Sequence, residues 1–132
     1  MSIKFQSLVP NLMAADVNKT AAFYEKVLGF NVVMSVPEAG QWDWVMLKRE
    51  DTTIMFQSRT SIEADLTSFG NQPIGGTLSF YIKVSNVRAL FEYLKENVTI
   101  VKPLKVSFYG ATEFVIQDLD GYYLMFSEYE NN

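Results

Sequence analysis

This chain contains no histidine and no cysteine, so any chemistry it performs must use other side chains. Without histidine it lacks the commonest general base and the commonest metal ligand of proteins. Without cysteine it forms no disulfide and no thiolate nucleophile. No Gly-x-Ser-x-Gly pattern occurs, and Gly75-Gly76 lacks the lysine and the spacing of a phosphate-binding loop. We therefore expect no catalytic residue of the nucleophile-and-base type.

The acidic residues with the clearest motif are Glu113, Asp118 and Asp120, which lie before and within Asp118-Leu-Asp-Gly121. Asp-Gly is a strong hairpin signal, so we interpret the two aspartates as shaping a turn by local hydrogen bonds. Glu113 could act as a base or bind a cationic ligand, and an exposed strand carboxylate is the alternative. Glu128 and Glu130 are interpreted as solvated.

This hairpin has an earlier, weaker copy, and the two copies organise the chain. Residues 44–58 superpose without a gap on residues 114–128, and Ile54-Met55-Phe56 falls on Leu124-Met125-Phe126. Asp16-Val17 falls on Asn86-Val87 at the same offset. A constant offset across several elements indicates two similar modules.

Each copy predicts the order strand, helix, three strands. In the first copy we expect strands at residues 3–12, 30–36, 42–48 and 53–58, and a helix capped by Asp16 that stops at Gly29. In the second we expect strands at 77–84, 113–117 and 122–127, shorter strand pieces at 99–102 and 106–112, and a helix capped by Asn86. Residues 1–132 thus form one α+β domain, with modules at 1–58 and 77–132. Residues 59–76 have no clear period and are expected to form a linker or lid.

Strand alternation predicts which residues share a face. If Met55 and Met125 face inward, so do Ser7, Asn11, Thr53, Gln57, Thr77, Tyr81, Tyr123 and Ser127. The opposite side is uniformly apolar and fits a surface under helices: Leu8, Leu12, Ile54, Phe56, Leu78, Phe80, Ile82, Leu124 and Phe126. The first set mixes hydroxyl, amide, aromatic and thioether groups, as small-molecule pockets do. A polar, solvent-facing sheet surface without a ligand is the alternative.

Eight residues are candidates for ligand contact from their position or chemistry: Trp42, Trp44, Met55, Gln57, Tyr81, Glu113, Tyr123 and Met125. The two tryptophans alternate on one face of an expected strand, where they could stack on a ligand or pack in the core. The two methionines could line an adaptable pocket or fill gaps in the core.

Charge and hydropathy narrow the class of partner. Eleven Lys plus Arg against fifteen Asp plus Glu give a net charge of −4 and a pI near 4.8, which argues against nucleic acid. An acidic surface tolerates cationic ligands. No apolar run reaches the length of a membrane span and no leader-like segment is visible, so we expect a cytoplasmic protein.

Two motifs resemble the vicinal oxygen chelate superfamily of glyoxalases, bleomycin-resistance proteins and dioxygenases; they are Asp16-x(6)-Phe23-Tyr24-x(3)-Leu28-Gly29-Phe30 and Tyr109-Gly-Ala-Thr-Glu-Phe114-x(3)-Asp118-x-Asp120-Gly121. The resemblance covers nearly the whole chain. It implies paired βαβββ modules whose strands curl into a cup, completed in a homodimer. It also implies that Tyr109 lies near the mouth of the cup, which makes this residue a ninth candidate for ligand contact. Metal ligands of such proteins would fall on Val9, Met55, Ser79 and Met125, which do not form a ligand set for a hard metal. We expect neither a metal nor another cofactor.

The resemblance favours a metal-free binding protein, closest to the bleomycin-resistance branch, that sequesters an organic ligand, with a cation as one option. The first alternative is a metal-dependent lyase, isomerase or dioxygenase with ligands in other places, such as Gln57, Glu113 or Glu128. The second is a non-catalytic interaction module. Enzyme activity stays open at this point, with binding preferred.

Overall fold

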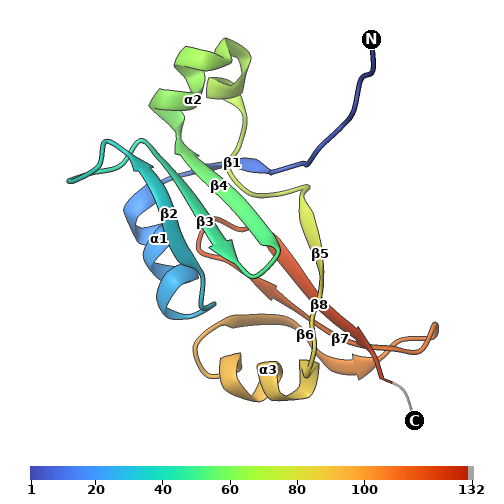
Figure 1. Ribbon diagram of the computed structural model, residues 1–132. Coiled ribbons are helices and arrows are strands. Elements are labelled where there is room, and N and C mark those ends of the chain that lie inside the picture. Colours follow the sequence, from blue (N-terminus) through green and yellow to red (C-terminus); the bar gives the residue numbers. More distant parts are fainter. Residues whose placement is uncertain (131–132) are drawn as a thin grey trace. The chain divides into compact units, whose positions relative to one another are not determined.

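Two four-stranded mixed sheets and three α-helices make up an α+β fold over residues 1–130, which the computed structural model describes (Figure 1). The chain divides into unit 1, formed by Met1–Glu25 and Gly29–Gln72, and unit 2, formed by Lys26–Leu28 and the chain from Pro73 onward. Each unit contains the order β-α-β-β-β, so the predicted pair of βαβββ modules is confirmed. Within residues 1–130, no helix is long and apolar enough to span a membrane.

Unit 1 has the strand order β1-β4-β3-β2, with β1 parallel to β4 and the other pairs antiparallel. Its elements are β1 (Asn11–Ala14), α1 (Val17–Lys26), β2 (Asn31–Val36), β3 (Trp44–Arg49), β4 (Thr52–Ser58), α2 (Arg59–Asp65) and the 3-10 helix η1 (Thr67–Asn71). The core lies between α1 and one face of the sheet. Tyr24 of α1 is fully buried, and its ring centroid lies 5.0 Å from that of Phe56 and 5.5 Å from that of Phe30.

Unit 2 repeats this arrangement with the strand order β5-β8-β7-β6. Its elements are β5 (Ser79–Lys83), α3 (Val87–Leu94), β6 (Thr99–Val106), β7 (Ala111–Gln117) and β8 (Tyr123–Tyr129). Phe114 is buried between Phe91 of α3, at 5.2 Å, and Phe126 of β8, at 5.1 Å between ring centroids. Alternation along β4 and β8 thus buries Ile54, Phe56, Leu124 and Phe126, as predicted. Leu78 precedes β5 and is 39% exposed, so the prediction that it packs under a helix is wrong.

Strands β1 and β4 of unit 1 correspond to strands β5 and β8 of unit 2 at the predicted offset. Asn11 is the register partner of Met55 in unit 1, and Tyr81 is the register partner of Met125 in unit 2. In each module the residue beside the methionine therefore lies two positions after Val9 or Ser79, the positions that the resemblance implied.

The first strand of each hairpin, β3 in unit 1 and β7 in unit 2, does not keep that offset. Trp44 pairs with Gln57, whereas Glu113 pairs with Ser127. The counterpart of Trp44 is therefore Glu113 and not Phe114, and the predicted gapless superposition is wrong by one residue over this strand.

A longer turn explains the shift. Four residues separate the paired Lys48 and Thr53, and five separate the paired Gln117 and Tyr123. The side chain of Asp118 accepts hydrogen bonds from two backbone N–H groups of the longer turn, both at 2.9 Å. The interpretation of Asp118 as a turn-shaping residue is confirmed.

Several predicted strand boundaries differ from the structure, and three of the differences are large. The strand expected at residues 3–12 is observed only as β1, so Leu8 is exposed and the prediction that it packs under a helix is wrong. The strand expected from Trp42 begins at Trp44. The piece expected at 99–102 extends through Pro103 to Val106 as one irregular edge strand, β6. The piece expected at 106–112 is not a strand of its own, because residues 107–110 form a turn and residues 111–112 begin β7. Proline is tolerated at an edge because its missing N–H need not pair.

Residues 59–71 carry helices that the absence of periodicity concealed. Ser58 caps α2, since its hydroxyl oxygen accepts a hydrogen bond from the backbone N–H of Ser61. The Arg59 guanidinium donates to the carbonyl oxygens of Gly70 and Gln72, at 2.6 and 2.9 Å. These bonds fold the segment back on itself after β4.

Helix α3 is capped by a residue from a distant strand. Asn86 adopts φ +61° and makes no side-chain capping bond. The Glu128 carboxylate of β8 instead accepts hydrogen bonds from the backbone N–H groups of Asn86 and Val87, both at 3.0 Å. Glu130 pairs with Arg88 at 2.9 Å. Asn86 is thus the N-cap residue of α3, as predicted, although its side chain makes no capping bond. The prediction that Glu128 and Glu130 are merely solvated is wrong.

We expect Glu128→Ala to lower the free energy of unfolding by about 1–2 kcal/mol, because two helix N–H groups lose their acceptor. Asn86→Gly is the matched control and should cost only a few tenths of a kcal/mol, since glycine accepts a positive φ. Urea denaturation followed by circular dichroism measures both. A larger loss for Asn86→Gly than for Glu128→Ala would contradict the assignment of the cap.

The predicted cap of α1 is present. Asp16 accepts a hydrogen bond from the backbone N–H of Lys19 at 3.1 Å and one from the Gln41 side chain at 3.2 Å. These bonds, the Lys19 backbone N–H first, lower the pKa of the Asp16 carboxyl.

A lowered pKa in the folded state stabilises the fold at neutral pH, and this contribution is lost as the pH falls through that pKa, below the ordinary value of about 3.9. We therefore expect Asp16→Ala to cost about 1 kcal/mol at pH 7 and less at strongly acid pH. Urea denaturation of both proteins at neutral and acid pH checks this. An equal difference at both would mean that the carboxylate charge is not involved.

Candidate ligand-binding faces

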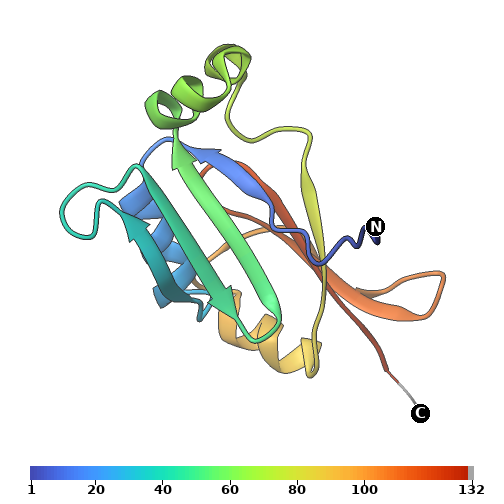
Figure 2. The same cartoon turned by 45° about the horizontal axis from the view of Figure 1, so that its top comes forward.

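Helix α1 lies against one face of the sheet of unit 1 (Figure 2). The opposite face is open and carries three methionines, a valine and a tryptophan. Met34, Met46 and Met55 lie in one cross-strand row over β2, β3 and β4. Val36 and Trp44 are register partners in the next row. Met34 and Val36 are more than half exposed, and Trp44, Met46 and Met55 are half-buried. We call these five residues the methionine face.

The centre of the methionine face is fixed by one contact. The indole N–H of Trp44 donates to the thioether sulfur of Met55 at 3.3 Å. An aromatic plane beside flexible, polarisable thioethers can adapt to apolar ligands of different shape. The face is therefore suited to hold a flat organic group.

A polar network closes one end of this face. The Gln57 side chain accepts a hydrogen bond from Asn11 at 2.8 Å and donates to the Ser61 hydroxyl at 2.8 Å and to the Asp65 carboxylate at 2.9 Å. Gln57 is buried, and Asp65 is exposed on α2. The network brings an accessible carboxylate to the end of an apolar surface, where it could pair with a cationic group.

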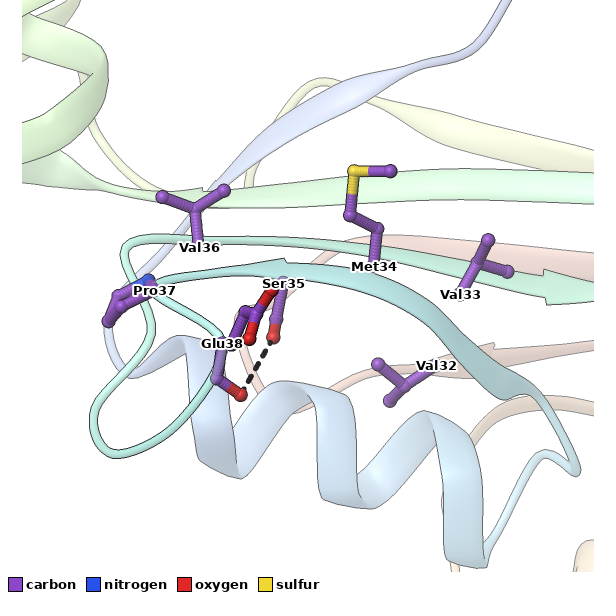
Figure 3. A pocket seen from close by; sticks show the side chains of 7 residues that line it. All are labelled: Val32, Val33, Met34, Ser35, Val36, Pro37 and Glu38. Carbon is purple, nitrogen blue, oxygen red and sulfur yellow. Dashed lines mark hydrogen bonds between the residues drawn. The ribbon is translucent and has the colours of Figure 1, made fainter.

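A groove of about 580 Å³ runs along β2 and adjoins the methionine face. Figure 3 shows Met34 and Val36 on the side away from α1 and Val32 on the side of the helix; the lining residues are Val32, Val33, Met34, Ser35, Val36, Pro37 and Glu38. A register shift between Val32 and Met34 interrupts the alternation of β2. One strand and its turn line the groove, so it extends the face but does not enclose a ligand by itself.

Trp42 lies outside β3, in the loop that precedes it. Its backbone N–H donates to the Asn18 side chain of α1 at 2.7 Å, and Asn18 in turn donates to the carbonyl oxygen of Gly40 at 3.0 Å. Its indole nitrogen is buried, with no hydrogen-bond partner among residues 1–130. The two tryptophans therefore lie in different places. Trp44 is in a strand of the open face, and Trp42 is in a loop that is hydrogen-bonded to α1.

The open face of the sheet in unit 2 carries a chain of hydroxyl groups that ends on Glu113. The Tyr81 hydroxyl donates to Ser127 at 2.9 Å, and Ser127 donates to Glu113 at 3.0 Å. The Tyr109 hydroxyl donates to the same Glu113 oxygen at 2.5 Å, and this bond raises the pKa of Tyr109. We call these four residues the Glu113 network.

Lysines lie on both sides of this network in the sheet. Lys83 is the register partner of Ser127, and Lys105 is the register partner of Glu113. Tyr123 and Met125 are half-buried on the same face. A cationic ligand there would meet a carboxylate flanked by two ammonium groups, which would repel it. We therefore expect a cationic group to bind more weakly on this face than beside Asp65.

The residues at the family's metal positions do not fit a metal. Val9 and Ser79 lie outside the register of Met55 and Met125, and the true neighbours of the two methionines are Asn11 and Tyr81. The first set has two thioethers, one hydroxyl and the valine side chain, which has no donor atom; the second has two thioethers, an amide and a phenol. Neither is a set that binds a hard divalent cation. Among residues 1–130, no group of three or more acidic side chains is arranged to hold a metal ion.

The three residues considered as ligands in other places are engaged elsewhere. Gln57 serves the network of unit 1, while Glu113 accepts from two hydroxyl groups and Glu128 caps α3. Gln57 lies in unit 1 and the two glutamates in unit 2. Each unit therefore uses these side chains for its own hydrogen bonds.

Sequence reasoning missed four residues of the unit 1 site: Met34, Val36, Met46 and Asp65. Alternation from Trp44 gives Met46 directly, so that signal was available. Met34 and Val36 required the position of the bulge in β2, and Asp65 required the helix after β4.

The comparisons with known proteins agree with this architecture. The family model described as the Glyoxalase/Bleomycin resistance protein/Dioxygenase superfamily matches residues 6–126. No curated protein matches the sequence.

Solved structures share the fold over nearly their whole length. TioX from Micromonospora sp. ML1 is 18% identical, with a TM-score of 0.75 and coverage of 96% of this chain and 100% of that chain. A hypothetical protein, SA1046, from S. aureus is 24% identical, with a TM-score of 0.74 and coverage of 95% and 94%. The bleomycin-binding protein of Streptomyces verticillus, solved with copper(II)-bleomycin, is 23% identical, with a TM-score of 0.66 and coverage of 98% and 100%. Together with the family match, the module architecture identifies this chain as a member of the glyoxalase/bleomycin resistance protein/dioxygenase superfamily.

Proposed function

We propose that this protein binds a small organic molecule without a metal, and that the methionine face is the main contact surface. The observation that carries the proposal is the contact of Trp44 with Met55 at the centre of a half-exposed apolar face. Ligand sites of proteins combine such apolar surface with a few convergent polar groups, which Gln57 and Asp65 supply here.

The ligand we propose has a flat apolar part and a positively charged group. The flat part would stack on Trp44, and the charged group would pair with the Asp65 carboxylate. The Glu113 network, with Tyr123 and Met125, is proposed as a second, separate contact surface in unit 2. The net charge of −4 is compatible with a cationic ligand.

We further propose that the protein acts as a homodimer and as a binding protein rather than an enzyme. Binding is favoured because Asp65 and Glu113 each accept a hydrogen bond from a neighbouring side chain and the family's metal positions include two thioethers. The structural likeness to a bleomycin-binding protein makes bleomycin a reasonable first probe.

Tryptophan fluorescence tests the proposal, because one tryptophan lies on the face and the other in a loop. Chelator-treated protein would be titrated with metal-free and with copper-bound bleomycin. We expect a saturable change in the unmodified protein and in Trp42→Phe, and its loss in Trp44→Phe. A change that depends on Trp42 alone would contradict the methionine face. No change at high micromolar ligand would exclude bleomycin as the ligand.

A further inference from the structure

Three thioether groups lie on neighbouring strands at the centre of the methionine face. Met46 of β3 is the register partner of Met34 on β2 and of Met55 on β4, so the three residues form one cross-strand row. Neighbouring strands lie about 4.8 Å apart, and register partners project from the same side of a sheet. Methionine side chains are long and flexible, so the outer two can lean over Met46 and bring three sulfur atoms around one point.

This row is accessible from solvent. Met34 is 56% exposed, and Met46 and Met55 are half-buried. Figure 3 shows the Met34 side chain on the side of β2 that faces away from α1, the same side as Val36. A dissolved ion can therefore reach the sulfur atoms without a rearrangement of the backbone.

One of the three thioethers is held in place by a neighbour. The indole N–H of Trp44 donates to the sulfur atom of Met55 at 3.3 Å. A thioether sulfur has two lone pairs, and this hydrogen bond uses one of them. Trp44 thus orients Met55 while leaving its sulfur atom able to bind a further partner.

The chemistry of thioethers selects the kind of ion that such a row would hold. Soft sulfur ligands favour copper(I), whereas carboxylate, carbonyl and water oxygens suit hard cations such as magnesium and calcium. The property that excludes a hard divalent metal from this face therefore favours a soft monovalent one. The net charge of −4 also favours the approach of a cation.

We propose that Met34, Met46 and Met55 form a binding site for a soft monovalent cation of the copper(I) type. The three thioethers would be its ligands, and Trp44 would be a positioning residue for Met55. The site lies on the methionine face but does not depend on the proposed function. A bound cation would occupy the thioethers that the organic ligand would contact, so the metal-free protein is the form that would bind that ligand.

Titration of the full-length protein with silver(I), an air-stable analogue of copper(I), tests this site. Chelator-treated protein in chloride-free buffer would be titrated by isothermal titration calorimetry with silver(I) and, in a separate experiment, with zinc(II). We expect saturable, equimolar binding of silver(I) and no binding of zinc(II) over the same range of concentrations. Copper(I), kept reduced under nitrogen, should bind with the same equimolar stoichiometry.

Leucine variants assign the ligands, because leucine nearly conserves the volume of methionine and removes the sulfur atom. The variants are Met46→Leu alone and a triple variant with Met34→Leu, Met46→Leu and Met55→Leu; Met125→Leu in unit 2 is the control. Loss of a residue that only supports a metal ligand typically costs 10–100-fold in affinity. We therefore expect Met46→Leu to raise the silver(I) dissociation constant at least ~10-fold, the triple variant to lose equimolar binding, and the control to be unchanged.

Circular dichroism of each variant checks that the fold is retained. If the triple variant does not fold, the single variant and the methyl signals of ¹³C-methionine in the unmodified protein decide the question. Silver(I) should then shift the signals of the three face methionines and leave that of Met125 in place.

Three results would overturn the proposal: no equimolar silver(I) binding by the unmodified protein, equally tight binding of zinc(II), or an unchanged silver(I) affinity in a folded triple variant. The last result would mean an adventitious ion only, bound elsewhere on the chain. Titration with metal-free bleomycin separates this proposal from the proposed function. A bleomycin response without silver(I) binding would refute the thioether site alone, and silver(I) binding without a bleomycin response would refute bleomycin as the organic ligand alone.

Discussion

Phe56→Ala is expected to lower the free energy of unfolding by about 3–5 kcal/mol, the usual cost of removing a buried aromatic side chain. Phe56 is fully buried at the centre of β4 and packs on Tyr24. Domains of this size are stable by only about 5–15 kcal/mol, so the variant should be close to unfolding at 37 °C. Urea denaturation followed by circular dichroism measures the loss.

Met55→Ala is the matched control, since Met55 is the adjacent residue of the same strand and faces the other side. We expect it to cost about 1 kcal/mol of stability, because Met55 is only half-buried. It should weaken ligand binding instead. A stability loss equal to that of Phe56→Ala would show that Met55 belongs to the core. It would contradict the assignment of Met55 to the methionine face.

Trp44→Ala is expected to weaken binding of the best ligand by roughly 30-fold, or about 2 kcal/mol, as for an aromatic residue at the centre of a contact surface. The expected cause is the loss of the stacking plane and of the contact that orients Met55. Isothermal titration calorimetry with the chelator-treated protein measures the change.

Trp42→Ala controls for general damage to unit 1. Its backbone hydrogen bond to Asn18 does not need the indole ring, so the loop can remain in place. We expect the dissociation constant to change by less than about threefold, as for residues outside a contact surface. Equal weakening of binding by Trp44→Ala and Trp42→Ala would contradict the proposal that the ligand binds the methionine face.

The module architecture followed from local patterns that the structure retains. Apolar alternation around Ile54 and Phe56 predicted the side of the sheet that α1 covers, and Asp16 predicted the start of that helix. These signals are reliable because each depends on near neighbours in sequence. Leu8 shows the limit of alternation, since Pro10 ends the ladder before the pattern does.

Contacts between distant residues were the part that sequence could not supply. Glu128 and Val87 lie 41 positions apart, yet they form the cap of α3. The hairpin match hid a one-residue difference because the extra residue lies in a turn, where strand periodicity gives no signal. Trp44 and Met55 were candidates for ligand contact, with packing in the core as the alternative for each. Asp65 was missed because a seven-residue helix is too short to show a period.

The most direct test of the proposed function uses methionine methyl groups as reporters. The chain has six methionines; Met34, Met46 and Met55 lie on the methionine face, and Met13 is 2% exposed in the core. Metal-stripped protein labelled with ¹³C at the methionine methyl groups would be titrated, in NMR experiments, with metal-free bleomycin and with a set of aromatic amines. The proposed function predicts saturable shifts of the three face methionines and an unchanged Met13. No shift with any compound, or shifts confined to other methionines, would contradict it.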